Sequence, residues 1–182
     1  DSGVYLGDYI IDRKPVIITP DAGQGKTYGQ VDPVLAYTIS EDLFGSDTFT
    51  GALARDAGED VGSYAIGLGD LSAGNNYAPS LSGAASFAIT QATVQSIDTI
   101  VNDVAMTAFE VRNTSSAEQV LGLASLPASL SVTTDGGTAM LPVTWETSTA
   151  YDSKGAAYAV TGTLQGNDNI NSDGRTCSIT LR

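Results

Sequence analysis

Residues 26–37 read Lys26-Thr27-Tyr28-Gly29-Gln30-Val31-Asp32-Pro33-Val34-Leu35-Ala36-Tyr37, and this stretch decides how the fold is interpreted. Gly29 allows the backbone to bend, and Asp32-Pro33 favours a turn because the proline ring fixes φ at about −65°. The apolar run at 34–39 is short and rich in residues that favour strands. The stretch therefore predicts a bend, a turn and then a strand.

The same alternation of short apolar runs and turn residues continues on both sides. Runs rich in Val, Ile, Tyr and Phe lie at 9–11, 16–18, 64–66 and 87–89, with glycine or asparagine in nearly every gap. Such runs are typical of short strands. One helix of about two turns is predicted at 117–124, where Ser116 and Gln119 have capping-box spacing. The chain is therefore predicted to be mostly β.

A repeat links the start of the chain to its middle. Residues 9–17 (Tyr-Ile-Ile-Asp-Arg-Lys-Pro-Val-Ile) align with residues 87–94 (Phe-Ala-Ile-Thr-Gln-Ala-Thr-Val), and both read as strand, short polar joint and strand. Self-similarity at such an interval indicates an array of modules. We therefore divide the chain into residues 1–14, a leftover strand of a preceding module or a linker, and two modules at 15–91 and 92–182. The parent protein is expected to be a longer array.

Several motifs of the first module stand in a distinctive order. They are Tyr28-Gly29 with Asp32-Pro33, the strand Gly62-Ser63-Tyr64-Ala65-Ile66, and the turn Gly74-Asn75-Asn76-Tyr77. Over about residues 16–90 this order resembles the MBG ("mostly beta grasp") repeat of large bacterial surface and secreted proteins. The resemblance implies a β-grasp-like scaffold module without known chemistry.

The second module carries Leu141-Pro142-Val143-Thr144-Trp145 and later Val160-Thr161-Gly162-Thr163-Leu164. It resembles a bacterial Ig-like domain over roughly residues 92–182. The predicted fold class is therefore mostly β, with a β-grasp-like module followed by an Ig-like β-sandwich. Alternation places Leu141, Val143 and Trp145 on one face, which predicts Trp145 as the large core residue between two sheets. Cys177 is predicted to be a buried thiol in the last strand, at 177–181.

The composition argues against several classes of function. Among the 182 residues there is no histidine and one cysteine, so the chain has no Ser/His/Asp triad, no Cys/His pair and no histidine ligand for zinc. A formal net charge of −13 opposes binding to nucleic acid and to anionic membrane surfaces. No apolar run is long enough for membrane insertion. Catalysis by two carboxylates needs no histidine, but the glutamates are scattered over both modules. We therefore predict no enzyme and no catalytic residues.

The polar run at 167–174 is the one candidate metal site. The side chains of Asn167, Asn169, Asn171 and Asp173 offer alternate oxygens, which are ligands that calcium prefers. Against calcium, Ser172 stands where a calcium loop has its tight-turn glycine, and no bidentate glutamate follows. A solvated hairpin loop is the preferred interpretation and calcium the alternative, and no other cofactor is predicted.

Two further alternatives stay open at this point. Four strand tyrosines, Tyr28, Tyr37, Tyr64 and Tyr77, would form a platform for stacking on sugars if they were exposed together. Lys26 or Lys154 would form an isopeptide cross-link if it were buried beside an asparagine and an acid. We expect strand tyrosines to lie in the core or at its rim, and the sequence does not place either lysine.

These observations predict a non-catalytic structural or spacer module of a secreted or cell-surface bacterial multidomain protein, which displays or spaces other domains. Its partners would be neighbouring modules of the same chain. In the alternative, an adhesin-type module would bind a host glycan or protein. The acidic composition with few lysines favours an extracellular or bacterial cell-surface location. Because the chain begins with Asp1 and shows no signal peptide, we expect a mature or excised fragment.

Overall fold

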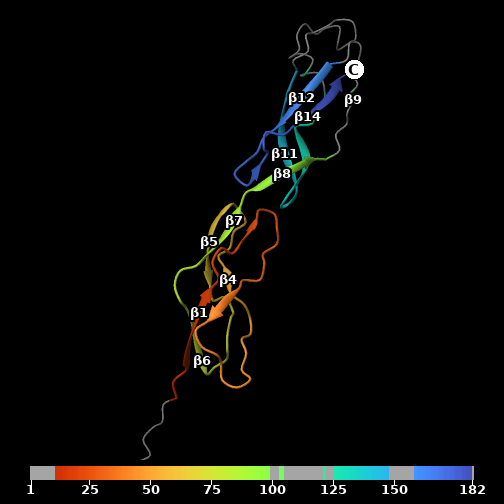
Figure 1. The fold of residues 1–182 in the computed structure, drawn as a ribbon. Helices are drawn as coiled ribbons and strands as arrows, with labels where there is room; N and C mark the ends of the chain where they lie inside the picture. The colour runs from red at the N-terminus through yellow and green to blue at the C-terminus, as the bar shows by residue number, and fades with distance from the viewer. Residues whose placement is uncertain (1–10, 99–102, 105–120, 122–124, 148–157, 182) are drawn as a thin grey trace, which may run out of the picture. The chain divides into compact units, whose positions relative to one another are not determined.

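The computed structural model describes residues 11–98, 103–104, 121, 125–147 and 158–181, and the regular structure in this part of the chain is almost entirely β (Figure 1). The predicted mostly β fold is confirmed. The helix predicted at 117–124 falls outside the described residues except for Leu121, which is helical. No helix among the described residues is long and apolar enough to cross a membrane. The strands are β1 (Lys14–Pro20), β2 (Gly25–Thr27), β3 (Tyr37–Ile39), β4 (Ala54–Arg55), β5 (Gly62–Gly67), β6 (Tyr77–Leu81), β7 (Ser86–Thr90), β8 (Ala92–Ile97), β9 (Asp103–Val104), β10 (Ser129–Thr134), β11 (Gly137–Glu146), β12 (Tyr158–Leu164), β13 (Ile170–Asn171) and β14 (Thr176–Leu181).

The chain forms two compact units. The first contains Asp1–Lys26, Asp32–Gly58 and Gly62–Ile89, and the second contains Thr27–Val31, Glu59–Val61 and Thr90–Arg182. Two short loops, 27–31 and 59–61, therefore belong to the second unit although they interrupt the sequence of the first.

The first unit contains two small sheets, ordered β3-β1-β6 and β2-β7-β5-β4. Burial alternates along β1: Val16 and Ile18 are fully buried, and Ile17 between them is 45% exposed. This period of two is what a strand with one buried face requires. β1 runs antiparallel to β3 and parallel to β6. In the other sheet, β7 contributes Phe87 and Ile89 to the apolar interior.

The strand predicted at 34–39 is shorter than expected. Only Tyr37–Ile39 pairs with β1, and Val34 is 88% exposed. The Gln24 side chain binds both backbone polar groups of Ala36, just before β3. Its Oε1 accepts a hydrogen bond from the Ala36 N–H at 2.6 Å, and its Nε2 donates to the Ala36 carbonyl at 3.0 Å. The Ala36 carbonyl also accepts from the N–H of Asp21, the residue after β1, at 3.0 Å, so both backbone polar groups of Ala36 are satisfied.

In the second unit, seven strands built from the described residues follow the order β13-β8-β10-β11-β12-β14-β9. The long strand β11 connects the two halves of this order. It pairs with β10 through residues 137–142 and with β12 through residues 143–146. At one end of the order, β8 meets β13 in parallel.

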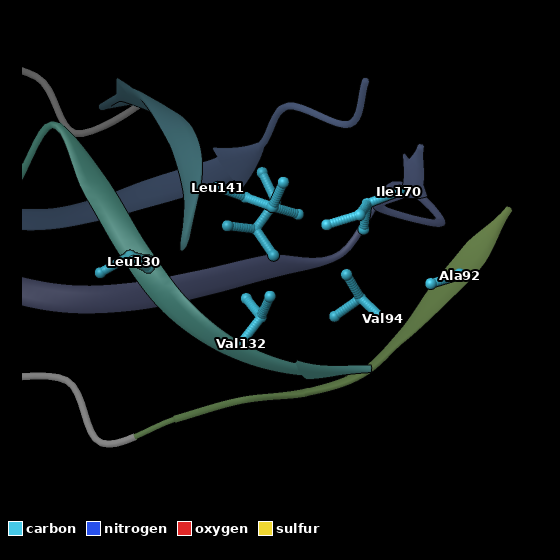
Figure 2. Packing of buried hydrophobic residues seen from close by; sticks show 7 residues of the cluster. Ala92, Val94, Leu130, Val132, Leu141 and Ile170 are labelled. Carbon is cyan, nitrogen blue, oxygen red and sulfur yellow. The ribbon is translucent and has the colours of Figure 1, made fainter. Parts of the chain in front are cut away.

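A cluster of aliphatic side chains forms the core of the second unit. Figure 2 shows Val94, Val132, Leu141 and Ile170, from four different strands, directed into one interior. Burying a side chain of this kind contributes about 1.5–3 kcal/mol. The buried members of the cluster are Ala92, Val94, Leu130, Val132, Leu141, Leu164 and Ile170.

Trp145 lies at the margin of this core, so its prediction as the large core residue is wrong. The alternation is as expected, with Leu141 buried and Trp145 half-buried on the same side of β11. The indole Nε1 donates a hydrogen bond to the Pro127 carbonyl at 2.7 Å. The ring covers Gly162 of β12, where an added Cβ would fall 2.6 Å from it. A tryptophan keeps a partner for its N–H, and here that partner lies at the edge of the core.

Cys177 lies in β14, so the strand predicted at the end of the chain is confirmed. Its side chain is half-buried rather than fully buried. The thiol lies 3.7 Å from the Gly162 carbonyl, and burial raises the pKa of Cys177 above its usual value. A thiol of this kind stays protonated at neutral pH and is a weak nucleophile.

Candidate functional site

Three charged side chains meet in the first unit beside the Asp-Pro turn, and we call them the ionic cluster: Lys26, Asp32 and Arg55. Lys26 comes from β2, Arg55 from β4 and Asp32 from the loop between β2 and β3. The Lys26 Nζ lies 2.6 Å from Asp32 Oδ1. Arg55 donates two hydrogen bonds to the same carboxylate, from Nε to Oδ2 at 2.6 Å and from Nη2 to Oδ1 at 3.0 Å. This is the bidentate geometry that a guanidinium prefers.

Strand alternation explains why a lysine faces the interior. In β2 only Lys26 is buried, while Gly25 and Thr27 face the opposite side. The side chains of Lys26 and Arg55 are 4% and 8% exposed, and that of Asp32 is 41% exposed. A buried cation is costly without a counter-ion. The partly exposed Asp32 carboxylate is therefore the counter-ion of two nearly buried cations.

The electrostatics of the ionic cluster keep Asp32 ionised. Its hydrogen bonds from Arg55, then those from Lys26, lower the pKa of Asp32 from 3.8 to about 2, against the opposing effect of desolvation. The carboxylate is therefore charged throughout the pH range in which most proteins are folded.

Arg55 also organises the loop that follows β4. Its Nη1 donates to the carbonyls of Asp56 at 2.9 Å and Gly58 at 2.6 Å. Its guanidinium lies over the rings of Tyr64 and Phe87, 5.0 Å and 5.3 Å from their centroids. Stacking and hydrogen bonding together fix both the arginine and the loop.

The sequence reasoning missed the role of Arg55. Three acidic residues, Asp56, Glu59 and Asp60, follow Arg55 closely in the sequence, but the carboxylate that Arg55 binds is Asp32, 23 residues earlier. Asp56 contacts the arginine through its backbone carbonyl. Nothing in the sequence indicated that Lys26 faces inward, because β2 is only three residues long and was not among the predicted strands.

The ionic cluster does not offer the chemistry of an isopeptide cross-link. Lys26 is buried as that hypothesis requires, but its neighbour is an aspartate rather than an asparagine. A lysine amine attacks a neutral acyl group, and Arg55 holds Asp32 in the ionised form, which is a poor electrophile. The other candidate, Lys154, lies outside the described residues.

The four strand tyrosines do not form an exposed platform. Tyr28, Tyr37 and Tyr64 are each partly buried, and Tyr77 is 2% exposed. Tyr37 and Tyr77 belong to the sheet ordered β3-β1-β6, whereas Tyr64 belongs to the other sheet of the first unit. An aromatic surface for sugars needs rings exposed on one face, and these rings serve packing instead.

A groove of about 270 Å³ opens beside Tyr77, and we call it the β1 groove. Tyr77 lines it, and its hydroxyl donates to Asp47 Oδ2 at 2.6 Å and accepts from the Phe44 N–H at 2.8 Å. The hydrogen bond to the Asp47 carboxylate raises the pKa of Tyr77. Phe44 is 67% exposed at the rim, with the Lys14 Nζ 4.4 Å from its ring centroid. The groove is lined by Ile11, Asp12, Arg13, Lys14, Phe44, Asp47, Asn75, Asn76 and Tyr77.

The predicted calcium ligands lie in β13, which contains Asn171, and in the loops on either side of it, and three of them accept hydrogen bonds from backbone N–H groups. Asn167 Oδ1 accepts from the N–H groups of Asn169 at 2.9 Å and Ile170 at 2.8 Å. Asn171 Oδ1 accepts from the Asp173 N–H at 2.9 Å, and Asp173 adopts a positive φ of 54°. These are asparagine turns of the kind expected in a hairpin loop.

The amide of Asn169 is engaged on both sides, with Oδ1 accepting from the Val61 N–H and Nδ2 donating to Asp60 Oδ1, each at 2.8 Å. Among the described residues no group of three or more acidic, histidine or cysteine side chains could hold a metal ion. Calcium binding at 167–173 stays a prediction.

Taken together, the two units define a modular protein of short strands whose polar motifs hold loops in place. Residues 16–87 match the family described as MBG domain (YGX type), which covers less than half of the chain and supports the MBG assignment of this segment. MBG domains are non-catalytic structural modules of multidomain proteins. No curated protein and no solved structure shows significant similarity to the chain. The Ig-like assignment of the second module therefore stays a prediction.

Proposed function

We propose that the chain is a non-catalytic spacer segment of a secreted or cell-surface bacterial multidomain protein, in which it displays or separates other domains. The observation that carries the proposal is that polar side chains of the MBG segment are bound to other groups of the protein itself. Asp32 and Arg55 bind each other, Arg55 also binds backbone carbonyls, and none of the described buried side-chain nitrogen or oxygen atoms lacks a hydrogen-bond partner. Binding and catalytic sites commonly keep polar groups available for a ligand.

The surface charge supports an extracellular setting. A net charge of −13 limits self-association and adsorption to phosphate-rich polymers. Neighbouring modules of the same chain are the proposed partners.

A binding screen tests the proposal. The purified chain is applied to glycan arrays, mucins and matrix proteins, with and without calcium, and its melting temperature is measured under both conditions. An unrelated acidic protein of similar charge serves as the control for charge-driven adsorption. A spacer gives no saturable binding beyond this control. Saturable binding would overturn the proposal in favour of an adhesin-type module, and a calcium-dependent rise in melting temperature would favour the calcium alternative at 167–173 over the solvated loop.

A further inference from the structure

The first strands of the two units, β1 and β8, begin with the same backbone arrangement. In the first unit, the Lys14 N–H donates to the Asn76 carbonyl at 2.8 Å, and Lys14 pairs with Tyr77 in parallel. The first strand of the unit is thus attached to the residue just before β6 and to the first residue of β6.

In the second unit, the Ala92 N–H donates to the Asn169 carbonyl at 3.0 Å, and Ala92 pairs with Ile170 in parallel. The sequence repeat of 9–17 with 87–94 also places Lys14 opposite Ala92. Sequence and backbone therefore agree on one register, in which Asn76 and Asn169 are equivalent residues.

The side chain of Asn169 is occupied within the second unit. It accepts from the Val61 N–H and donates to the Asp60 carboxylate, and both residues belong to the loop 59–61 of that unit. An asparagine amide can satisfy a donor and an acceptor at once, so it suits an acidic turn that presents both.

The side chain of Asn76 has no such partner. It is exposed and makes no hydrogen bond within the part of the chain that the structure describes, although its backbone position equals that of Asn169. Ile11 nearby is 93% exposed, whereas Ile89, its equivalent in the repeat, is 2% exposed in β7. At the β1 groove, Ile11 and the Asn76 amide are therefore both exposed to solvent, whereas Ile89 is buried and the Asn169 amide is hydrogen-bonded.

We propose that the β1 groove receives the acidic turn of another module of the same family on its N-terminal side, with Asn76 binding that turn as Asn169 binds Asp60 and Val61. This inference rests on the proposed spacer function, since it names the partner of the segment. The groove carries both signs of charge, Asp12 and Asp47 as well as Arg13 and Lys14, and the exposed Arg13 is the cation that would pair with a turn of the Glu59-Asp60-Val61 type. The joint between modules would then be fixed by hydrogen bonds as well as by the covalent chain.

The test uses a tandem chain in which residues 1–90 are followed by residues 13–182, so that residues 13–90 occur twice. The first copy is labelled with ¹⁵N by segmental ligation, and hydrogen exchange of its Val61 N–H is followed by NMR. Asn76→Ala in the second copy is compared with Asn75→Ala, its exposed neighbour in the same groove. In the unextended chain, Asn169→Ala provides the positive control for exchange at Val61.

We expect Asn76→Ala to accelerate exchange of the first copy's Val61 N–H by about 2- to 10-fold, as the loss of one hydrogen bond requires. Asn75→Ala leaves that rate unchanged, and Asn76→Ala in the unextended chain leaves its melting temperature unchanged. The inference is overturned if the first copy's Val61 exchanges like an open turn while the spectra of the first copy remain native. That result would contradict docking at the β1 groove but leave the spacer function standing, with modules joined only by the covalent chain. Saturable binding in the screen would instead contradict the spacer function and would leave the exchange rates unchanged.

Discussion

The two units secure their loops in different ways. The first relies on charge: two nearly buried cations share the Asp32 carboxylate and through it hold the loop before β3. The second relies on neutral groups, with the amides of Asn167 and Asn171 bound to backbone N–H groups over an aliphatic core. Ion pairs respond to pH and salt, whereas amide turns and apolar contacts respond little. The two units should therefore be separable by solution conditions as well as by substitution.

The largest expected effect comes from opening the core of the second unit. Leu141→Ala removes a fully buried side chain from the centre of the cluster and should lower the free energy of unfolding of that unit by about 2–5 kcal/mol. Trp145 is the chain's one tryptophan, so its fluorescence during urea denaturation reports on this unit. Met140→Ala is the matched control, because Met140 is 61% exposed on the same strand. Equal losses for the two variants would contradict the core described here.

A smaller loss should follow from crowding the margin of the same unit. An added Cβ at Gly162 meets the Trp145 ring at 2.6 Å and a Val143 methyl at 2.8 Å, so Gly162→Ala should cost about 1–3 kcal/mol and shift the tryptophan emission. Gly83→Ala serves as the control, since nothing lies within 4 Å of its added Cβ. An unchanged emission spectrum would show that the indole does not rest on Gly162.

Removing the shared charge should weaken the first unit. Asp32→Asn leaves Lys26 and Arg55 without their carboxylate, and we expect a loss of about 1–2 kcal/mol at neutral pH. The estimate is modest because Asp32 is 41% exposed and water screens its charge. Hydrogen exchange of peptides from β5 and β7 measures the effect, and Trp145 fluorescence in the second unit should not change.

Acidic pH should remove the difference in stability between the parent chain and Asp32→Asn. The pKa of Asp32 is 3.8 when unfolded and about 2 when folded, so its contribution is present above pH 3.8 and is lost as pH falls toward 2. The gap in stability between the parent chain and Asp32→Asn should therefore close between those pH values. A gap that stayed constant down to pH 2 would refute the role of the ionic cluster.

The smallest effect tests the polar loop of the second unit. Asp173 has a φ of 54°, a conformation that glycine adopts more easily, so Asp173→Gly should stabilise the unit by up to about 1 kcal/mol. Asp168→Gly, where no positive φ occurs, should be neutral or destabilising by a similar amount. Thermal unfolding followed by tryptophan fluorescence compares the two. If Asp173→Gly instead lowered stability only when calcium is present, the metal interpretation of 167–173 would be supported.

The sequence predicted local features well because their causes are local. The strand at 16–18, the alternation at 141–145 and the asparagine turns at 167–173 all depend on residues that are neighbours in the sequence. The role of Asp32 could not be predicted in this way, because the arginine that binds it is 23 residues away. Trp145 was misplaced for a related reason: alternation gives the face of a strand but not the depth of burial, which here depends on Gly162 in the facing strand.

The parallel pairing of each first strand also dictates an order of folding. Lys14 pairs with Tyr77, and Ala92 pairs with Ile170, so neither first strand can join this ladder until nearly the whole of its module has been synthesised. Contacts so distant in sequence close slowly, because the chain entropy of a long loop must be overcome before the pairing contributes. Each module would thus leave a ribosome or a translocation channel with this parallel ladder still open, although β1 can already pair with β3 and β8 with β10, and the ladder would close in a late step.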